Sequence, residues 1–364
     1  MDADPGTAVG APTRTIGPTG DVLADPSPRP EPAPVSPSLA PPPARARMEW
    51  MDTLRGAAIL LMLTWHATSV PSLLHGEYVP AWLTATNNAL LPYRMPCLMF
   101  LSGLLLPRSM SKPLVHYYRG KLALIAYPYV LWVIVFCLTM GADRPYWDPR
   151  LYIAKGYLWY LFYIAVFYLV APLLRRVPPY LPPLVFLVAG TVVHSQIPHR
   201  MLFFAVFFFA GSWAAQRVGD IPSRLRNPWL IAALLVPTIG FAIVSATHKV
   251  NYQPLLAPFS FAGICVAIAA ASSLSSERTA KLRFVGRNSI VYYCVHFPAM
   301  VAVLAVLVTV GAPWWVTIPT LILVGVGVGT LAAVLRDRPP VRWLFEAPFL
   351  GNAPKPAPAA AGRG

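Results

Sequence analysis

MDTLRGAAILLMLTWH, residues 51–66, is a nearly continuous apolar run that ends on a histidine. Apolar runs of roughly 20 residues recur along the chain, and that length crosses the ~30 Å hydrocarbon core of a bilayer as a helix. Hydrophobic residues make up 56% of the chain and charged residues only 12%, about half the charged share of soluble domains. This composition excludes a water-soluble enzyme, and the continuous runs disfavour a transmembrane barrel, whose strands alternate.

The sequence predicts an all-α polytopic membrane protein with about ten transmembrane helices. The predicted spans are residues 53–71, 87–106, 121–140, 151–173, 180–195, 200–216, 228–247, 255–274, 288–310 and 314–335. The fifth begins at the crowded pair Pro182 and Pro183, and only the short stretch SQIPH separates it from the sixth.

The charge distribution predicts the orientation of these spans. The chain carries 29 Lys and Arg against 14 Asp and Glu, for a net charge of +15. With a cytoplasmic N-terminus, 22 of the 29 cations fall in inner segments and 5 in outer ones, while Arg55 and Arg94 lie within spans. Basic loops favour the cytoplasm, so both termini are expected there, in a multi-pass protein of the plasma (inner) membrane. No basic patch with interleaved aromatics indicates a nucleic-acid partner.

The ends of the chain differ from its apolar middle. Residues 1–45 contain 12 prolines and no apolar segment typical of a signal peptide. We therefore predict a disordered proline-rich cytoplasmic tail at 1–47, a transmembrane domain at 48–345 and a disordered tail at 346–364. The four cysteines lie in apolar segments without a CxxC pair, and no HxxxH occurs. Neither a metal site nor a tightly bound cofactor is expected.

Arg55 and His66 are 11 residues apart in the first predicted span. At ~100° and 1.5 Å per residue, they return to within about 20° of one helix face and lie roughly 16 Å apart along it. Charges inside spans are rare and usually functional. The alternative is structural: Arg55 would extend to the headgroups or pair with Asp52, and His66 would bond a neighbouring helix.

A second cation lies in LPYRMPCLMFLSG, residues 91–103. Arg94 is roughly 10 Å below the outer surface and His66 roughly 20 Å above the inner one, so in a ~30 Å core the two share a level. Pro92 and Pro96 predict an irregular backbone that lines a cavity. In the alternative interpretation, Arg94 extends outward to the headgroups.

Two further segments contribute candidate residues. Trp159 lies in YLWYLFY, residues 157–163, at a similar level, although aromatic clusters commonly serve packing or an interface belt. Asn288, Tyr292 and His296 are spaced four residues apart and predict one polar stripe, with a hydrogen-bonded core histidine as the alternative. None of the predicted spans contains Asp or Glu, which disfavours a carboxylate-relay pump.

Taken together, four segments resemble the acyltransferase 3 family of membrane O-acyltransferases. MDTLRGAAILLMLTWH is similar to the family's first-span signature, RMPCLMFLSGLLL to its MP-FF-SG segment, YLWYLF to its W-F/Y-L segment and SIVYYCVHFP to its Y-x-x-H-x-P segment. The resemblance runs from Met48 to about Pro298. Two positions depart from it: Arg94 stands where several relatives have His, and residues 118–123 hold only a basic cluster where many have Arg-x-x-Arg.

The resemblance implies transfer of a short acyl group, such as acetyl, from cytoplasmic acyl-CoA as co-substrate to a hydroxyl of a carbohydrate or glycolipid. It also implies functional roles for Arg55 and His66. Cations near the cytoplasm suit the phosphates of the donor, a neutral imidazole suits a general base, and a buried cation suits an oxyanion.

Roles are assigned on this basis. The expected catalytic residues are His66, Arg55 and Arg94; the expected residues that bind the acyl-CoA co-substrate are Arg55, Arg119 and Lys121; the expected substrate-binding residues are Trp159, Tyr292 and His296. A covalent acyl-histidine and a direct transfer are both compatible with the sequence. The alternative function is a transporter or flippase for a glycolipid or small molecule without transferase activity.

Overall fold

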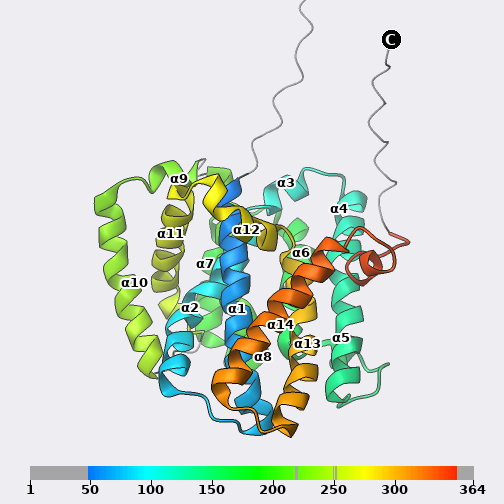
Figure 1. Ribbon diagram of the computed structural model, residues 1–364. Helices are drawn as coiled ribbons and strands as arrows, with labels where there is room; N and C mark the ends of the chain where they lie inside the picture. Colours follow the sequence, from blue (N-terminus) through cyan, green and yellow to red (C-terminus); the bar gives the residue numbers. More distant parts are fainter. Residues whose placement is uncertain (1–47, 218–219, 249, 251, 351–364) are drawn as a thin grey trace, which may run out of the picture. The chain divides into compact units, whose positions relative to one another are not determined.

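The computed structural model describes residues 48–217, 220–248, 250 and 252–350, which form helices joined by short connections and contain no strand (Figure 1). The predicted all-α class is thereby confirmed. The α-helices are α1 (Glu49–His75), α2 (Ala81–Gly103), α3 (Leu106–Met110), α4 (Leu114–Lys121), α5 (Tyr127–Met140), α6 (Trp159–Val170), α7 (Leu181–Val192), α8 (Gln196–Arg217), α9 (Ile221–Arg224), α10 (Pro228–His248), α11 (Ala257–Ser273), α12 (Ser276–Arg287), α13 (Ser289–Thr309) and α14 (Trp314–Val334).

In the described part of the chain, nine helical segments are long and apolar enough to cross a membrane. They are Glu49–His75, Ala81–Met110, Leu114–Met140, Gly156–Leu174, Gln196–Arg217, Pro228–His248, Pro254–Ser273, Ser289–Thr309 and Trp314–Val334. Helices dominate because lipid offers no hydrogen bonds to the backbone, so each spanning segment must satisfy its own amide groups.

The predicted fifth span, 180–195, is shorter than expected. It forms only α7, whose 12 residues extend about 18 Å at 1.5 Å per residue. Prolines at its start restrict where the helix begins, and Val193 leaves helical geometry with an extended backbone. The next helix begins four residues earlier than predicted, at Gln196, so Arg200 belongs to α8 and not to an outer loop.

Helix α1 runs through the middle of the bundle and packs against α2, α11, α12, α13 and α14 (Figure 1). In Figure 1 the beginning of α1 and the end of α14 lie at the same end of the bundle. We call this end proximal and the opposite end distal. The proximal end carries α12, from which Arg283 forms an ion pair with Glu49 of α1.

The C-terminal boundary differs slightly from the predicted one. Ala347 is fully buried, and its amide donates a hydrogen bond to the Ala123 carbonyl at 3.1 Å. Phe345 stacks on Trp132. Packing therefore continues past residue 345, whereas the predicted tails at 1–47 and 351–364 lie outside the described residues.

Two helix crossings depend on glycines that bring backbones into direct contact. A Cβ atom on Gly103 of α2 would lie 1.8 Å from the Phe208 carbonyl oxygen of α8, and one on Gly211 would lie 2.2 Å from the Phe100 carbonyl oxygen. The crossing of α1 and α12 is equally close at Gly56 and Gly286. Small residues allow such approach, which stabilises helix association in lipid.

We predict that Gly103→Ala destabilises the protein, because the added methyl group forces α2 and α8 apart. Overpacking of this kind typically costs about 1–3 kcal/mol. Thermal unfolding in detergent should show a lower transition temperature. Gly240→Ala is the matched control, since a Cβ atom added there would have no other atom within 4 Å, and equal transition temperatures for the two variants would contradict the prediction.

Candidate active site

A small cavity of about 40 Å³ lies inside the bundle between α1, α2, α6, α8 and α13. It contains two arginines, one histidine and a ring of aromatic side chains. The lining residues are Met62, Trp65, His66, Leu91, Arg94, Met95, Tyr157, Trp159, Arg200, Tyr252 and Tyr293. Polar side chains of a bundle core that meet around a cavity mark it as the candidate site.

His66 lines this cavity with a defined orientation. Its Nδ1 lies 3.1 Å from the Met62 carbonyl oxygen and 3.3 Å from Nε2 of His296. The Nδ1 of His296 in turn lies 3.0 Å from the Tyr292 carbonyl oxygen. A carbonyl can only accept, so His296 donates from Nδ1 and presents a lone pair on Nε2.

The hydrogen-bond partners of His66 likewise determine which of its ring nitrogens carries the proton. Its Nδ1 faces only acceptors, which are the carbonyl oxygen and the sulfur of Met62 and the Nε2 of His296, and it therefore carries the proton of the neutral ring. The lone pair of His66 then lies on Nε2, the nitrogen a general base would use. In many enzymes a carboxylate or amide side chain bonds one nitrogen of the catalytic histidine and so orients the ring. Here the side chain in that position is a second imidazole, that of His296.

His296 was predicted to bind substrate, but the structure places it behind His66. It is fully buried and is not among the residues that line the cavity. Two tyrosines fix its helix: the Tyr157 hydroxyl donates to the Cys294 carbonyl at 2.7 Å, and the Tyr293 hydroxyl donates to the Tyr157 carbonyl. His296 therefore contacts His66 and not the cavity.

Tyr292, also predicted to bind substrate, faces α14 instead. Its hydroxyl forms a hydrogen bond with Thr330 at 2.7 Å, and its ring fills the space above Gly329. The predicted polar stripe is therefore divided, since Asn288 bonds the Phe284 carbonyl of its own chain segment. Helical spacing places residues on one face, but the neighbouring helices decide which of them reach the cavity.

Arg94 lies in the cavity together with His66, as the depth arithmetic predicted. Only 4% of its surface is exposed, its Cζ lies 5.3 Å from the centre of the Trp65 ring, and its buried Nη1 has no hydrogen-bond partner among the described residues. The cation is therefore turned into the bundle and not toward a headgroup layer.

The expected irregular backbone around Arg94 is wrong, because α2 is continuous through both prolines. Pro92 has no amide to donate to the carbonyl four residues earlier, which belongs to Asn88. The hydroxyl of Ser245 on α10 donates to that carbonyl at 2.6 Å instead. A neighbouring helix thus satisfies the freed acceptor, a common remedy in membrane helices.

The predicted donor-binding residues lie toward the proximal end. Arg55 donates from Nη2 to the Leu101 carbonyl at 3.0 Å, and the next carbonyl, that of Ser102, accepts from the Tyr168 hydroxyl at 3.1 Å. The ammonium group of Lys121 lies 3.5 Å from the centre of the Tyr168 ring. Arg55 and Lys121 therefore approach the same part of α2, whereas Arg119 is exposed on α4.

Sequence reasoning missed eight of the eleven residues that line the cavity, among them Tyr157, Arg200, Tyr252 and Tyr293. Arg200 was counted among the outer-loop cations because the predicted span began there. Trp159, by contrast, was predicted and does line the cavity.

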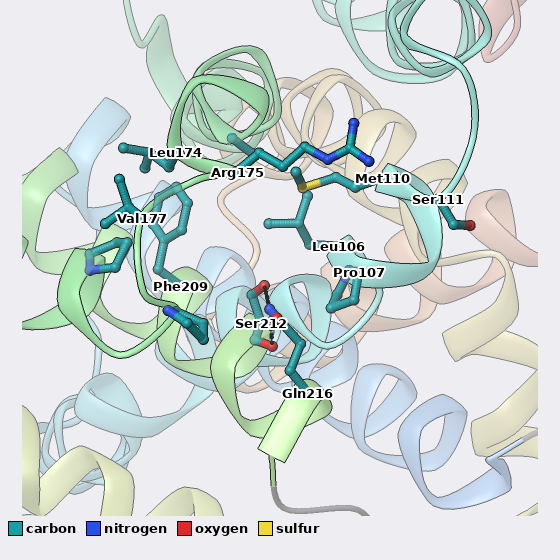
Figure 2. Close-up of a pocket in the computed structure, with 13 residues that line it drawn as sticks. Leu106, Pro107, Met110, Ser111, Leu174, Arg175, Val177, Phe209, Ser212 and Gln216 are labelled. Carbon is teal, nitrogen blue, oxygen red and sulfur yellow. Dashed lines mark hydrogen bonds between the residues drawn. The ribbon is translucent and has the colours of Figure 1, made fainter.

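A second cavity of about 320 Å³ lies near the proximal end, beside α3 (Figure 2). Figure 2 shows Arg175 extending along one side of it and Ser212 hydrogen-bonded to Gln216 on another. None of the predicted site residues lines it. Among the described residues, no three His, Cys, Asp or Glu side chains lie close enough together to hold a metal ion.

A model of one protein family, described as an acyltransferase domain, matches residues 48–335. The chain belongs to the acyltransferase 3 family. Comparisons with curated proteins and with solved structures found no significant match. As a membrane acyltransferase, the protein must bring an acyl donor and an acceptor together, and its central cavity contains the imidazole and cations suited to that chemistry.

For this acyltransferase, we predict that His296→Leu lowers kcat about tenfold or more, because one hydrogen bond of ~1.4 kcal/mol no longer orients His66. His296→Gln should retain more activity, since its side-chain oxygen can accept from Nδ1 of His66. The KM for the acyl donor should change little in either variant. Equal kcat values for the two variants would show that His296 contributes packing volume alone.

Proposed function

We propose that this acyltransferase transfers a short acyl group, such as acetyl, from acyl-CoA to a hydroxyl of a carbohydrate or glycolipid. The observation that carries the proposal is the buried pair of His66 and His296, which leaves a lone pair on the His66 Nε2, in a histidine that lines the same cavity as the Arg94 cation. A base and an oxyanion-stabilising group in one water-poor cavity suit acyl transfer to a weak nucleophile.

In the proposed reaction, His66 Nε2 removes the proton from the acceptor hydroxyl as its oxygen attacks the thioester carbonyl. The carbonyl oxygen becomes negative in the tetrahedral intermediate, and Arg94 stabilises it through Nη1, which bonds no other described residue. The carbon–sulfur bond then breaks, and the CoA thiolate takes the proton from the His66 imidazolium. The ester forms without a net change in protonation of the enzyme.

The donor is proposed to enter from the proximal end, which we assign to the cytoplasm of a plasma-membrane protein. The basic residues on that side support this assignment, because cytoplasmic loops favour Lys and Arg. Arg55 bonds α2 directly, and Lys121 lies against Tyr168, whose hydroxyl bonds α2. Both cations suit the donor phosphates, with the exposed Arg119 as an outer contact. The pantetheine arm would then follow α1 from Arg55 to His66.

The decisive experiment measures transfer and hydrolysis of radiolabelled acetyl-CoA by the purified protein in nanodiscs, with and without carbohydrate extracts. His66→Ala should lower the rate about 10²–10⁴-fold, the usual loss for a missing general base. His75→Ala is the matched control, because His75 lies exposed at the end of the same helix. Near-normal turnover in a correctly inserted His66→Ala protein would refute the mechanism, and a transporter would show neither activity.

Arg94 provides a separate prediction. Arg94→Gln should lower kcat about 10²–10³-fold, the usual loss of an oxyanion-stabilising donor, with little change in the KM for acetyl-CoA. Arg94→Lys should recover part of the rate, since it keeps the charge but loses the planar fork. Arg144→Gln, in a distal loop where Arg144 pairs with Asp148, is the control. Normal turnover in Arg94→Gln would assign Arg94 to packing.

A further inference from the structure

Arg200 lies at the junction of two cavities. It lines the central cavity with His66 and Arg94, and it also lines a larger vestibule of about 450 Å³. The vestibule is bordered by His194, Gln196, His199, Arg200, Tyr252 and Gln253. Only Arg200 and Tyr252 line both spaces, so the Arg200 side chain lies where the vestibule adjoins the cavity that holds His66.

The surroundings of Arg200 leave its polar edge available. Its Cζ lies 3.9 Å from the centre of the Trp159 ring and 4.8 Å from that of Tyr252, which hold the guanidinium by cation–π contacts. Its buried Nε has no hydrogen-bond partner among the described residues. The rings therefore orient the cation but do not satisfy its donors, and a buried unsatisfied donor costs roughly 1–3 kcal/mol.

The segments that build the vestibule contain no acidic residue to neutralise this charge. The sequence contains no Asp or Glu between Glu77 and Asp143, between Asp148 and Asp220, or between Asp220 and Glu277. These intervals contain every vestibule residue and most of the cavity lining. Two arginines in an acid-free, partly dehydrated site attract anions, and a guanidinium binds phosphate or carboxylate through two parallel hydrogen bonds.

The vestibule wall is itself held in place by hydrogen bonding. His199, one residue before Arg200, donates from Nδ1 to the Val193 carbonyl at 2.9 Å. This bond closes the short connection between α7 and α8. The early end of α7 and the early start of α8 thus bring the side chain of Arg200 to the level of Trp159.

We propose that the vestibule admits the acyl acceptor and that Arg200 binds an anionic group on it. This inference rests on the proposed function and narrows its acceptor to a carbohydrate or glycolipid headgroup that carries a phosphate or a carboxylate. With the anion on Arg200, a hydroxyl of the same molecule can extend into the central cavity toward His66. The site would thereby select acidic over neutral sugars.

The first test measures anion binding without any catalysis. Thermal unfolding of the purified protein is followed in nanodiscs with increasing inorganic phosphate, at constant ionic strength. Phosphate should stabilise the wild-type protein, because a ligand that binds only the folded state raises its stability. It should stabilise Arg200→Gln much less, whereas the control Arg144→Gln should respond as the wild type. Equal responses of the wild type and Arg200→Gln would overturn the anion site.

The second test identifies which substrate the anion belongs to. Carbohydrate extracts are separated by anion exchange into acidic and neutral pools, and each pool is offered with radiolabelled acetyl-CoA. The wild type should label the acidic pool, and Arg200→Gln should raise the KM for that pool about tenfold or more. Arg200→Lys should recover part of the affinity.

Other outcomes would contradict the proposal in distinguishable ways. Labelling confined to the neutral pool would overturn the acidic acceptor. A raised KM for acetyl-CoA in acceptor-free hydrolysis by Arg200→Gln would assign the anion to the donor. Absence of both hydrolysis and transfer in the wild type would refute the proposed function, while phosphate binding would still decide whether Arg200 forms an anion site.

Discussion

Backbone amide groups that cross lipid must find their hydrogen-bond partners within the protein, and this constraint governs most of the bundle. It explains why the apolar segments form helices and why proline is accepted in α2. The carbonyl freed by Pro92 accepts from Ser245 of the adjacent helix, and α2 continues as one helix through the turn that carries Arg94. Glycines such as Gly103 contribute separately to helix packing, because they let the backbones of neighbouring helices touch.

Polar groups in the core are tolerated because each is held by a specific arrangement. His66 and His296 bond to each other and to backbone carbonyls, which links α1 to α13. Arg94 and Arg200 lie against aromatic rings. Neither arginine is fully satisfied by the described residues, and both line the central cavity. Under the proposed function, the unsatisfied donors of these two arginines are available to bind the negative charge of the reaction intermediate or of an anionic substrate.

The cations fall into two groups at different depths. Arg55 and Lys121 lie toward the proximal end near Tyr168, and Arg94 and Arg200 lie around the central cavity. His66 is in the second group but on the same helix as Arg55. This division suits a reaction with two substrates that bind at different positions along the bundle, with α1 connecting the two positions.

The sequence alone determined the class of fold, the family and the approach of Arg94 to His66, because apolar length, helical rise and short motifs are properties of local chain segments. It did not determine which face of α13 meets the cavity: Tyr292 faces α14, and His296 lies behind His66. Nor did it reveal Arg200, whose role depends on where α7 ends and α8 begins. Those features follow from contacts between distant helices, which only the tertiary structure decides.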